Sequence, residues 1–588
     1  MNELLQIFKK DKSATILSSF LIIGVLFSEV LCWNFWGREL YPFVVICLSG
    51  TIALWLVLTR QSIISLTITD IFILIFFIYA VGNAFFKSSI NPPSDRIFYL
   101  VCSILFYVTI KLFWNSSKQY QIWVFAILSC ILIQCFFGIL QYFFDVNFGY
   151  GPHKITGTFT NPGIYGCFVA IGVPIVLYQL IYTAHYSKSK IVLLCIVALI
   201  VFMSLILSSS RTAGIASVVA AFVVSVREIY PKTSRILRYK FFSIIGTVIL
   251  FILFISFLWQ KNTLSISGRL LIWKISFFEI FLNYPITGIG YGNFFTEYGN
   301  YQRNFFLSGQ GNGQDIALAG MTYYPFNEYL RISIENGIVG LLLFIAIIAS
   351  VLNHKVRLFR SDNLLYLAVM LLILGCSFFS YPLENMSIYI ILIITIVALS
   401  QNNGKELSVI HIGKKIPKMF SVALIILILI FSSLKISAVL KWKDAQENIL
   451  VNEEKSYKTY KAIYPLLSQN GAFLFNYGAE LLSISDYRNS LRVLMRATKY
   501  GNSVELYMYL GDAYTGLQNN DLAEEYYIKS AYMVPKLFTP VYKLFLFYQR
   551  TNQIEKARLA ATKIIDMPIK VPSEKIDKIK YEAFNFLY

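Results

Sequence analysis

Long apolar stretches alternate with short polar connections over the first 440 residues of the chain. A helix needs about 20 mostly apolar residues to cross the hydrocarbon core of a bilayer. Stretches near that length recur at residues 14–32, 42–59, 64–86, 97–114, 121–144, 163–184, 191–208, 212–226, 241–259, 337–353, 364–381, 386–400 and 419–438. The pattern predicts about 13 transmembrane helices. We interpret the first as a membrane helix and not a cleaved signal peptide, because no small-residue cleavage site follows it.

Residues 441–588 have a different pattern, with an internal period of 33 or 34 residues. The spacing of the tetratricopeptide repeat (TPR), a helix hairpin of about 34 residues, is matched by Leu510, Gly511, Tyr514, Ala523, Tyr527 and Pro535. The same positions recur one repeat later at Leu544, Tyr548 and Ala557, and one repeat earlier at Gly478 and Ser490. The period predicts a soluble α-helical TPR solenoid with at least three hairpins across roughly 471–570. Such repeats serve protein contact or spacing and supply no chemistry of their own.

Composition divides the chain at the same place. Only 14% of all residues are charged, whereas a soluble domain carries about 25%. Residues 1–440 hold 31 Lys+Arg and 16 Asp+Glu, and residues 441–588 hold 20 and 16. A wholly soluble protein is therefore excluded. We predict an all-α chain made of a polytopic membrane helical bundle, residues 1–440, followed by a soluble extracytoplasmic helical domain, residues 441–588.

The positive charge of the membrane part indicates orientation. Basic clusters occur at Lys9–Lys12, Lys111–Lys118, Lys188–Lys190, Arg227–Lys240, Lys355–Arg360 and Lys405–Lys418. All of them fall on one side if the N-terminus is cytoplasmic, as the positive-inside rule requires. An odd number of crossings then places the C-terminal domain outside the cytoplasm. The net charge of +19 therefore reflects topology, and we expect no nucleic-acid partner.

Three connections share the predicted outer face: residues 145–162, the turn at 208–211, and a large loop at 260–326. A loop of that length inside a compact domain is usually functional or disordered. Within it, the amphipathic stretch Arg269–Leu282 predicts a helix lying on the membrane surface.

Four segments on this face carry short motifs. They are Gly157-Thr-Phe-Thr-Asn161-Pro162; Ser210-Arg211-Thr-Ala-Gly214; Gly268-Arg269, Trp273 and Pro285-Ile-Thr-Gly288-Ile-Gly290-Tyr-Gly292-Asn-Phe294; and Phe326-Asn327 with Gly337 and Gly340. In order, spacing and sidedness they resemble the motifs of the O-antigen ligase and polymerase superfamily. The resemblance covers roughly residues 150–350.

The resemblance implies an enzyme of the bacterial cytoplasmic (inner) membrane. Such an enzyme transfers an oligosaccharide or polysaccharide from undecaprenyl pyrophosphate to an acceptor hydroxyl at the periplasmic face. The acceptor stays open: lipid A-core for a ligase, a growing glycan for a polymerase, or an exported protein for a protein O-oligosaccharyltransferase. The C-terminal repeats on the same face make a protein acceptor or assembly partner more plausible.

Arg211 and Arg269 are the predicted catalytic cations. A glycosyl pyrophosphate donor leaves with negative charge, and arginine pairs bidentately with phosphate oxygens at any physiological pH. The alternative is that both arginines only anchor helix ends at the membrane interface. The family pattern favours the catalytic interpretation.

One position departs from the family. Ligases of this superfamily have a histidine thought to activate the acceptor hydroxyl, where this chain has Phe326. Two other side chains on the outer face are candidate bases, His153 and Glu328. We predict that Asn161, Gly288, Gly290, Gly292 and Asn327 bind substrate. No ligand cluster for a metal is evident on this face, and we expect no cofactor.

Two competing hypotheses remain. A lipid-linked glycan transporter or flippase should show internal symmetry and polar residues near the membrane midplane, and the sequence shows neither. A member that binds the carrier without catalysis is suggested by Phe326. Replacing Arg211 or Arg269 separates these possibilities.

Overall fold

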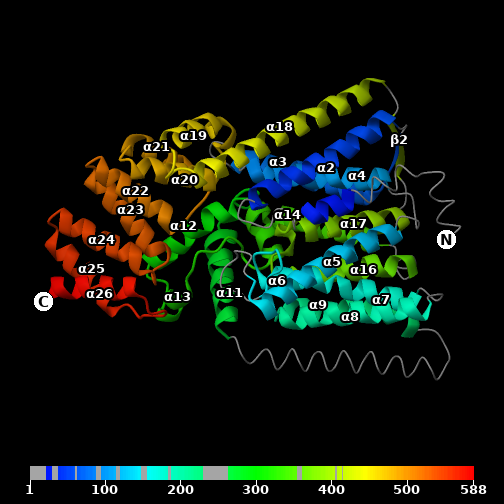
Figure 1. Cartoon of the computed structure of the whole chain (residues 1–588), viewed down its shortest axis with the longest axis horizontal. Helices are drawn as coiled ribbons and strands as arrows, with labels where there is room; N and C mark the ends of the chain where they lie inside the picture. Colours follow the sequence, from blue (N-terminus) through cyan, green and yellow to red (C-terminus); the bar gives the residue numbers. More distant parts are fainter. Residues whose placement is uncertain are drawn as a thin grey trace.

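The computed structural model describes residues 21–28, 37–59, 62–87, 94–113, 120–146, 155–182, 187–229, 263–353, 361–403, 407–412 and 415–588. Apolar helices lie side by side in one half of the molecule, and the C-terminal helices form the other end (Figure 1). The helices of the apolar half are α2 (Gly37–Thr59), α3 (Ile68–Lys87), α4 (Ser94–Phe113), α5 (Tyr120–Phe144), α6 (Pro162–Ala170), α7 (Gly172–Tyr182), α8 (Lys188–Leu207), α9 (Arg211–Ile229), α14 (Glu328–Leu352), α16 (Ser361–Cys376), α17 (Met386–Asn403) and α18 (Lys415–Glu447).

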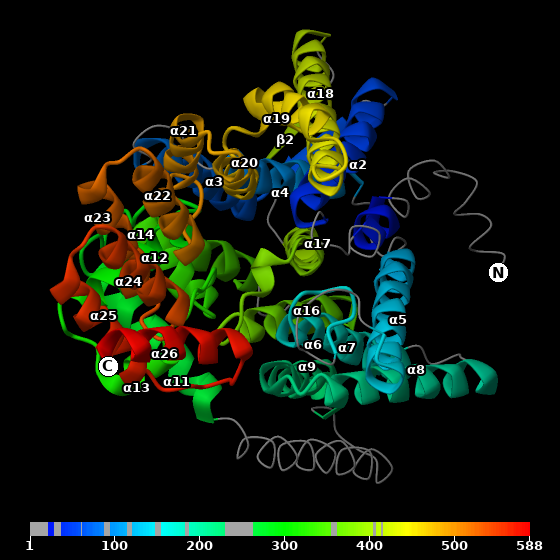
Figure 2. The ribbon, with the colours of Figure 1, turned by 60° about the vertical axis from the view of Figure 1, so that its left-hand side comes forward.

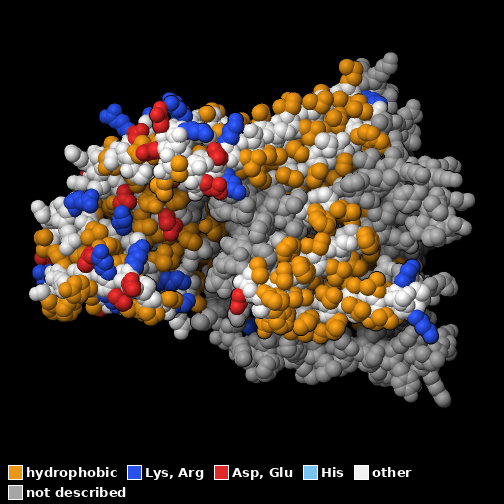
Figure 3. Space-filling model, in the orientation of Figure 1, with side chains coloured by type: hydrophobic (Ala, Val, Ile, Leu, Met, Phe, Trp, Pro, Cys, Tyr) orange, Lys and Arg blue, Asp and Glu red, His pale blue; other side chains and the backbone are white. Residues whose placement is uncertain are grey.

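The prediction of a multi-pass membrane protein is confirmed in its general form. Among the described residues, seven helices are long and apolar enough to cross a membrane, and three shorter apolar helices accompany them. The number thirteen is not confirmed, and the predicted span 241–259 lies outside the described residues. Helix α8 leaves Leu193 and Leu199 59% and 66% exposed, and the side chains coloured as hydrophobic cover much of this half in Figure 3. Such a surface is suited to lipid.

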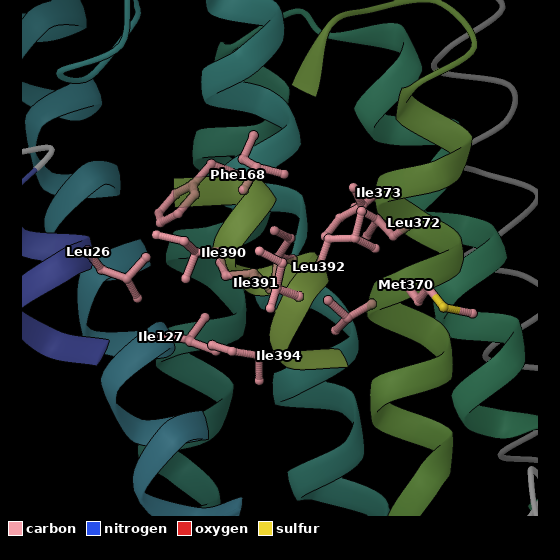
Figure 4. Packing of buried hydrophobic residues seen from close by; sticks show 14 of the residues in the cluster. Leu26, Ile127, Phe168, Met370, Leu372, Ile373, Ile390, Ile391, Leu392 and Ile394 are labelled. Carbon is pink, nitrogen blue, oxygen red and sulfur yellow. The ribbon is translucent and has the colours of Figure 1, made fainter. Parts of the chain in front are cut away.

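The core of this half is built on α16 and α17, which are among its most buried elements. Leu372 on α16 and Ile390 and Leu392 on α17 are at most 1% exposed, as are many of their neighbours. Figure 4 shows these side chains packed beside Phe168 of α6. Because α6 and α16 also contact α9, this core fixes the ends of the helices that carry the outer-face motifs.

Two features differ in detail from the predicted spans. A short antiparallel sheet joins β1 (Ser62–Leu66) and β2 (Ser408–Ile412), at the end of the bundle away from the C-terminal helices (Figure 1). The predicted span 364–381 ends earlier, at Cys376, and a turn with the 3-10 helix η2 (Pro382–Glu384) follows. The polar residues Ser377 and Ser380 and then Pro382 interrupt the apolar helix there.

The large loop forms four short helical elements between the two halves. These are α11 (Thr263–Ile275), the π-helical turn η1 (Ser276–Phe281), α12 (Phe294–Leu307) and α13 (Gly313–Leu318). The predicted helix at Arg269–Leu282 is present as α11 and η1. It runs across the direction of the membrane helices in Figure 1, the orientation expected of a helix parallel to a bilayer surface.

The C-terminal part consists of helices that pair in sequence order: α19 (Glu453–Leu467), α20 (Gly471–Ser483), α21 (Tyr487–Ala497), α22 (Val504–Gly516), α23 (Asn520–Met533), α24 (Phe538–Arg550), α25 (Ile554–Asp566) and α26 (Glu574–Leu587). Two positions after the last residue of helices α20, α22 and α24 stands a residue with positive φ, namely Ser485, Gln518 and Asn552. These residues stand 33 and 34 positions apart, so the predicted period recurs in the backbone itself.

The C-terminal helices dock onto the large loop. Gln302 of α12 donates from Nε2 to the carbonyl oxygen of Met533 at 2.6 Å, and Asn502 donates from Nδ2 to that of Thr296 at 3.0 Å. Gln302 and Asn502 are 1% and 3% exposed. In Figure 2, which is turned toward this end, α23 lies by α12. The loop and the C-terminal domain therefore share one end of the molecule.

Candidate active site

Two glutamines of α5 hold the first motif. Gln141 Oε1 accepts hydrogen bonds from the backbone N–H groups of Thr156 (2.8 Å) and Gly157 (2.7 Å). Gln134 Oε1 accepts from the N–H of Thr158 at 3.0 Å. All of these groups are buried, so each bond satisfies a backbone donor that would otherwise be costly. The motif is thereby fixed where the chain enters α6.

Asn161 begins α6. Its side-chain oxygen accepts from the N–H of Gly163 at 2.7 Å, and Pro162 follows at the first helical position. This is a favourable start for a helix, because the cap satisfies a free N–H and proline has none to satisfy. Asn161 is half-buried, and its predicted role in substrate binding stays a prediction.

The second motif packs directly against the first. Helix α8 ends at Leu207, Ser209 has a φ of 52°, and Arg211 opens α9. A Cβ atom on Gly166 of α6 would lie 2.5 Å from the Cβ of Ser210. Glycine is therefore needed here for α6 and the 208–211 turn to approach so closely. The N-termini of α6 and α9, with Arg211, lie at the same end of the bundle.

Arg269 of α11 reaches the same region from the large loop. Its Nη1 donates to the carbonyl oxygen of Phe379 at 2.8 Å, and its guanidinium lies 5.2 Å from the ring centre of Phe326. Burial lowers the pKa of Arg269, the Tyr381 hydroxyl partly offsets this, and the positive charge of Arg211 lowers it further. Because screened charges act on each other mainly at short range, this effect indicates that Arg211 and Arg269 lie near each other. Their catalytic role stays a prediction.

The Phe326 ring beside Arg269 belongs to an aromatic cluster. The rings of Tyr324 and Tyr381 stack with centres 4.2 Å apart, and Phe326 meets Tyr381 edge-on at 5.3 Å. Trp273 donates from Nε1 to the carbonyl oxygen of Pro325 at 2.7 Å. Residues of α11, of the 321–327 segment and of the α16–α17 turn thus meet around one guanidinium.

Asn327 and Glu328 begin α14, and their side chains have internal partners. Asn327 Oδ1 accepts from the N–H of Leu330 at 2.9 Å as the helix cap. Glu328 is 1% exposed; one carboxylate oxygen accepts from the N–H of Leu383 at 2.8 Å and the other lies 2.9 Å from Arg331 Nη2. Both oxygens of this carboxylate therefore have partners inside the fold. The role of Glu328 as the base stays a prediction.

A buried ion-pair network lies behind this helix start. The Arg96 guanidinium on α4 bonds both carboxylate oxygens of Glu384, at 2.7 and 2.6 Å, and Arg331 is paired with the same carboxylate. The network ties α4, the α16–α17 turn and α14 together beside Tyr381. Sequence reasoning missed it, because its members lie up to 288 positions apart and follow no local pattern.

The predicted substrate-binding glycines lie in a segment that packs on α14. Ile289 and Gly290 donate from their N–H groups to the carbonyl oxygens of Ile334 and Glu335, each at 2.9 Å. Gly288, Gly290 and Gly292 have φ values of 69°, 105° and 81°. A Cβ on Gly288 would lie 2.4 Å from the Ile334 oxygen. The structure thus gives these glycines a packing role, and a contact with substrate stays a prediction.

Phe326 has a φ of 55°, a conformation that bulky residues rarely adopt. It occupies the position where the resemblance led us to expect a histidine. His153, the other candidate base, lies outside the described residues.

The comparisons with known proteins bear on the two parts of the chain separately. Residues 166–345 match the model of the O-antigen ligase family. A search of curated proteins found no match. Among solved structures, MamA residues 41 to the end from Desulfovibrio magneticus RS-1 is 17% identical, covering 24% of this chain and 75% of that one with a TM-score of 0.20. A crystal structure of MamA is also 17% identical, covering 25% and 87%, with a TM-score of 0.22. Scores this low carry no conclusion about the C-terminal helices.

Proposed function

Because residues 166–345 form an O-antigen ligase family domain, we propose that the protein transfers a glycan from a polyprenyl pyrophosphate carrier to an acceptor hydroxyl. The observation that supports this proposal is that the charge of Arg211 lowers the pKa of Arg269, which indicates that these two cations lie near each other. Arg211 and Arg269 come from motifs far apart in the chain, and the charge of Arg211 acts on Arg269. Two guanidinium groups near each other suit a phosphate anion that both can bind.

The proposed reaction is a displacement at the anomeric carbon of the donor sugar. The acceptor oxygen forms the new glycosidic bond, the bond between that carbon and the phosphate oxygen breaks, and its electron pair stays with the pyrophosphate. The acceptor proton passes to a base, for which His153 and Glu328 are the candidates. Arg211 and Arg269 stabilise the charge that develops on the leaving group.

The surroundings suit a pyrophosphate attached to a lipid. The N-termini of α6, α9 and α14 lie at this end of the bundle, and helix N-termini favour anions. Ile215, one turn from Arg211, and Leu270, next to Arg269, are 47% and 54% exposed. An anionic headgroup at the arginines would thus have apolar side chains beside it for its polyprenyl chain.

We further propose that this end faces the periplasm of a bacterial inner membrane, with the N-terminus in the cytoplasm. The basic clusters of the sequence, which all fall on the opposite side from the outer-face motifs if the N-terminus is cytoplasmic, support this orientation. The C-terminal helices dock on the loop that carries Arg269, so an acceptor or partner held by them would stand near the site. Lipid A-core, a growing glycan and a protein remain the possible acceptors.

Deleting the gene and comparing surface lipopolysaccharide, carrier-linked glycan and glycoproteins tests the function and identifies the acceptor. Loss of long lipopolysaccharide with accumulated polymerised carrier-linked glycan indicates a ligase. Loss of chain length alone indicates a polymerase, and loss limited to protein modification indicates a protein transferase. Unchanged glycans in all three fractions would contradict the proposal.

A further inference from the structure

Phe326 contributes to the candidate site through its contact with Arg269. The guanidinium lies 5.2 Å from the centre of the Phe326 ring, within the range of a cation–π interaction. The same guanidinium also donates from Nη1 to the Phe379 carbonyl oxygen. The ring and the carbonyl together restrict the orientation of the guanidinium more than either contact alone.

The backbone of Phe326 is held in an unfavourable conformation. A φ of 55° costs a phenylalanine of order 1 kcal/mol or more, and such a conformation persists only where the surroundings determine it. They do so on both sides: Trp273 binds the carbonyl of Pro325, and the N–H of Glu328 donates to the Ser377 carbonyl at 2.9 Å. Tyr381 then packs edge-on against the ring. The chain thus maintains a strained residue whose ring faces a cation.

We propose that Phe326 is the positioning residue for Arg269, orienting its guanidinium toward the pyrophosphate of the carrier; this inference rests on the proposed function. Arginine has five N–H donors, and among the described residues the carbonyl of Phe379 is its hydrogen-bond acceptor. Donors of the fork therefore remain for phosphate oxygens. The ring supports the cation without competing for those donors.

The chemistry of the site favours a phenylalanine in this role. A protonated histidine here would repel Arg269, and a neutral one would change its charge with pH. The quadrupole of the Phe326 ring attracts the guanidinium at every pH. Phe326, at the position where the family's ligases have a base, thus holds the cation Arg269 in place in this chain.

Binding of undecaprenyl pyrophosphate to the purified full-length protein in phosphatidylcholine nanodiscs tests the inference. Phe326→Leu removes the aromatic face at similar size and should weaken binding about fivefold to thirtyfold. Phe326→Trp restores an aromatic face and should bind within about threefold of the wild type. Phe378→Leu is the matched control, because Phe378 lies in the adjacent turn and its ring packs on that of Tyr329, with centres 4.4 Å apart. Within the part of the chain that the structure describes, no cation lies over the Phe378 ring.

A double-mutant cycle shows whether Phe326 acts through Arg269. With Arg269→Ala as background, Phe326→Leu should have little further effect. Equal weakening in both backgrounds, or wild-type binding by Phe326→Leu, would overturn the inference. If Arg269→Ala itself binds and transfers like the wild type, the proposed function fails; if only Phe326→Leu is without effect, the positioning role alone fails.

Discussion

The guanidinium of Arg269 has contacts that depend on its planar shape as well as on its charge. A lysine at this position keeps a positive charge but has no plane to stack on Phe326 and no fork to match a pyrophosphate. The contact with the Phe379 carbonyl, at 2.8 Å, also needs the reach of the Nη1 group. Substitution of Arg269 by lysine can therefore separate the contribution of the positive charge from that of the planar guanidinium.

Arg269→Lys should lower the rate of glycan transfer about tenfold to a hundredfold, which is roughly 1.4 to 2.8 kcal/mol of transition-state stabilisation. The measurement is the initial rate with purified protein and carrier-linked donor. Arg303→Lys on α12 is the control, since its guanidinium bonds the side chains of Asn300 and Asn304. Wild-type rates for Arg269→Lys would show that charge alone is sufficient.

Residues with a motif around them were predictable, and residues without one were not. Arg211 and Arg269 are identified by their neighbours in the sequence. Gln134 and Gln141 stand alone in an apolar span, and only the fold brings them to the 156–158 backbone. The burial of Glu328 was not predictable, because adjacency to Asn327 says nothing about the direction in which a helical side chain points.

The segment 285–293 and helix α14 form one interlocked element. Gly337 has a φ of 64° inside α14, and the chain there pairs with Pro285, whose carbonyl accepts from the N–H of Ile338 at 2.8 Å. The span predicted from hydrophobicity, 337–353, began after the first turns of α14. Those turns are helical, but hydropathy did not detect them because they carry charged residues.

Gly288→Ala should destabilise this element by about 3 kcal/mol, because a Cβ would meet the Ile334 oxygen at 2.4 Å in a backbone with positive φ. Gly309→Ala separates the cost of the positive φ from the cost of the steric clash. Gly309 has a φ of 74°, but a Cβ there meets nothing within 4 Å. It should cost only about 1 kcal/mol. Thermal unfolding in detergent compares the two variants. Equal losses would mean that the close approach is unimportant.

The repeat helices end in a regular way that the sequence predicted only in part. The 33- or 34-residue period was visible in Gly511 and Ala523, whereas the positive φ at Ser485, Gln518 and Asn552 was not, because these residues share no side-chain type. After Gln518, the N–H of Asn519 bonds back to the Tyr514 carbonyl at 3.0 Å. This is the helix ending in which glycine is most favourable.

Gln518→Gly should therefore stabilise the C-terminal helices by about 0.5 to 1 kcal/mol, and Gln518→Val should destabilise them. Hydrogen exchange of the amides in α22 and α23 of the full-length protein provides the measurement. Faster exchange in Gln518→Gly than in the wild type would contradict this view of the helix ends.

Across the molecule, the C-terminal domain and the large loop form a joint structure at one end of the membrane helices. Sequence patterns predicted both parts and their common side, but not their contact. That contact depends on single polar residues such as Gln302 and Asn502, which look like ordinary surface residues in the sequence and are almost fully buried in the fold.

Gln302→Ala with Asn502→Ala should loosen the docking, since each change leaves a buried carbonyl without its donor at a cost of about 1 to 3 kcal/mol. We expect faster hydrogen exchange in α12 and α23 and faster proteolysis between the two parts. Lys458→Ala, in an exposed ion pair of α19, is the control. Unchanged exchange in the double variant would mean that other contacts hold the domain.

The most direct measurement is the rate of glycan transfer from undecaprenyl pyrophosphate to the acceptor that the deletion strain identifies. Arg211→Ala and Arg269→Ala should each reduce it by about a hundredfold or more, with Arg492→Ala, an exposed arginine of α21, at the wild-type rate. Transfer within about threefold of the wild type in both site variants would show that the two arginines are not the catalytic cations.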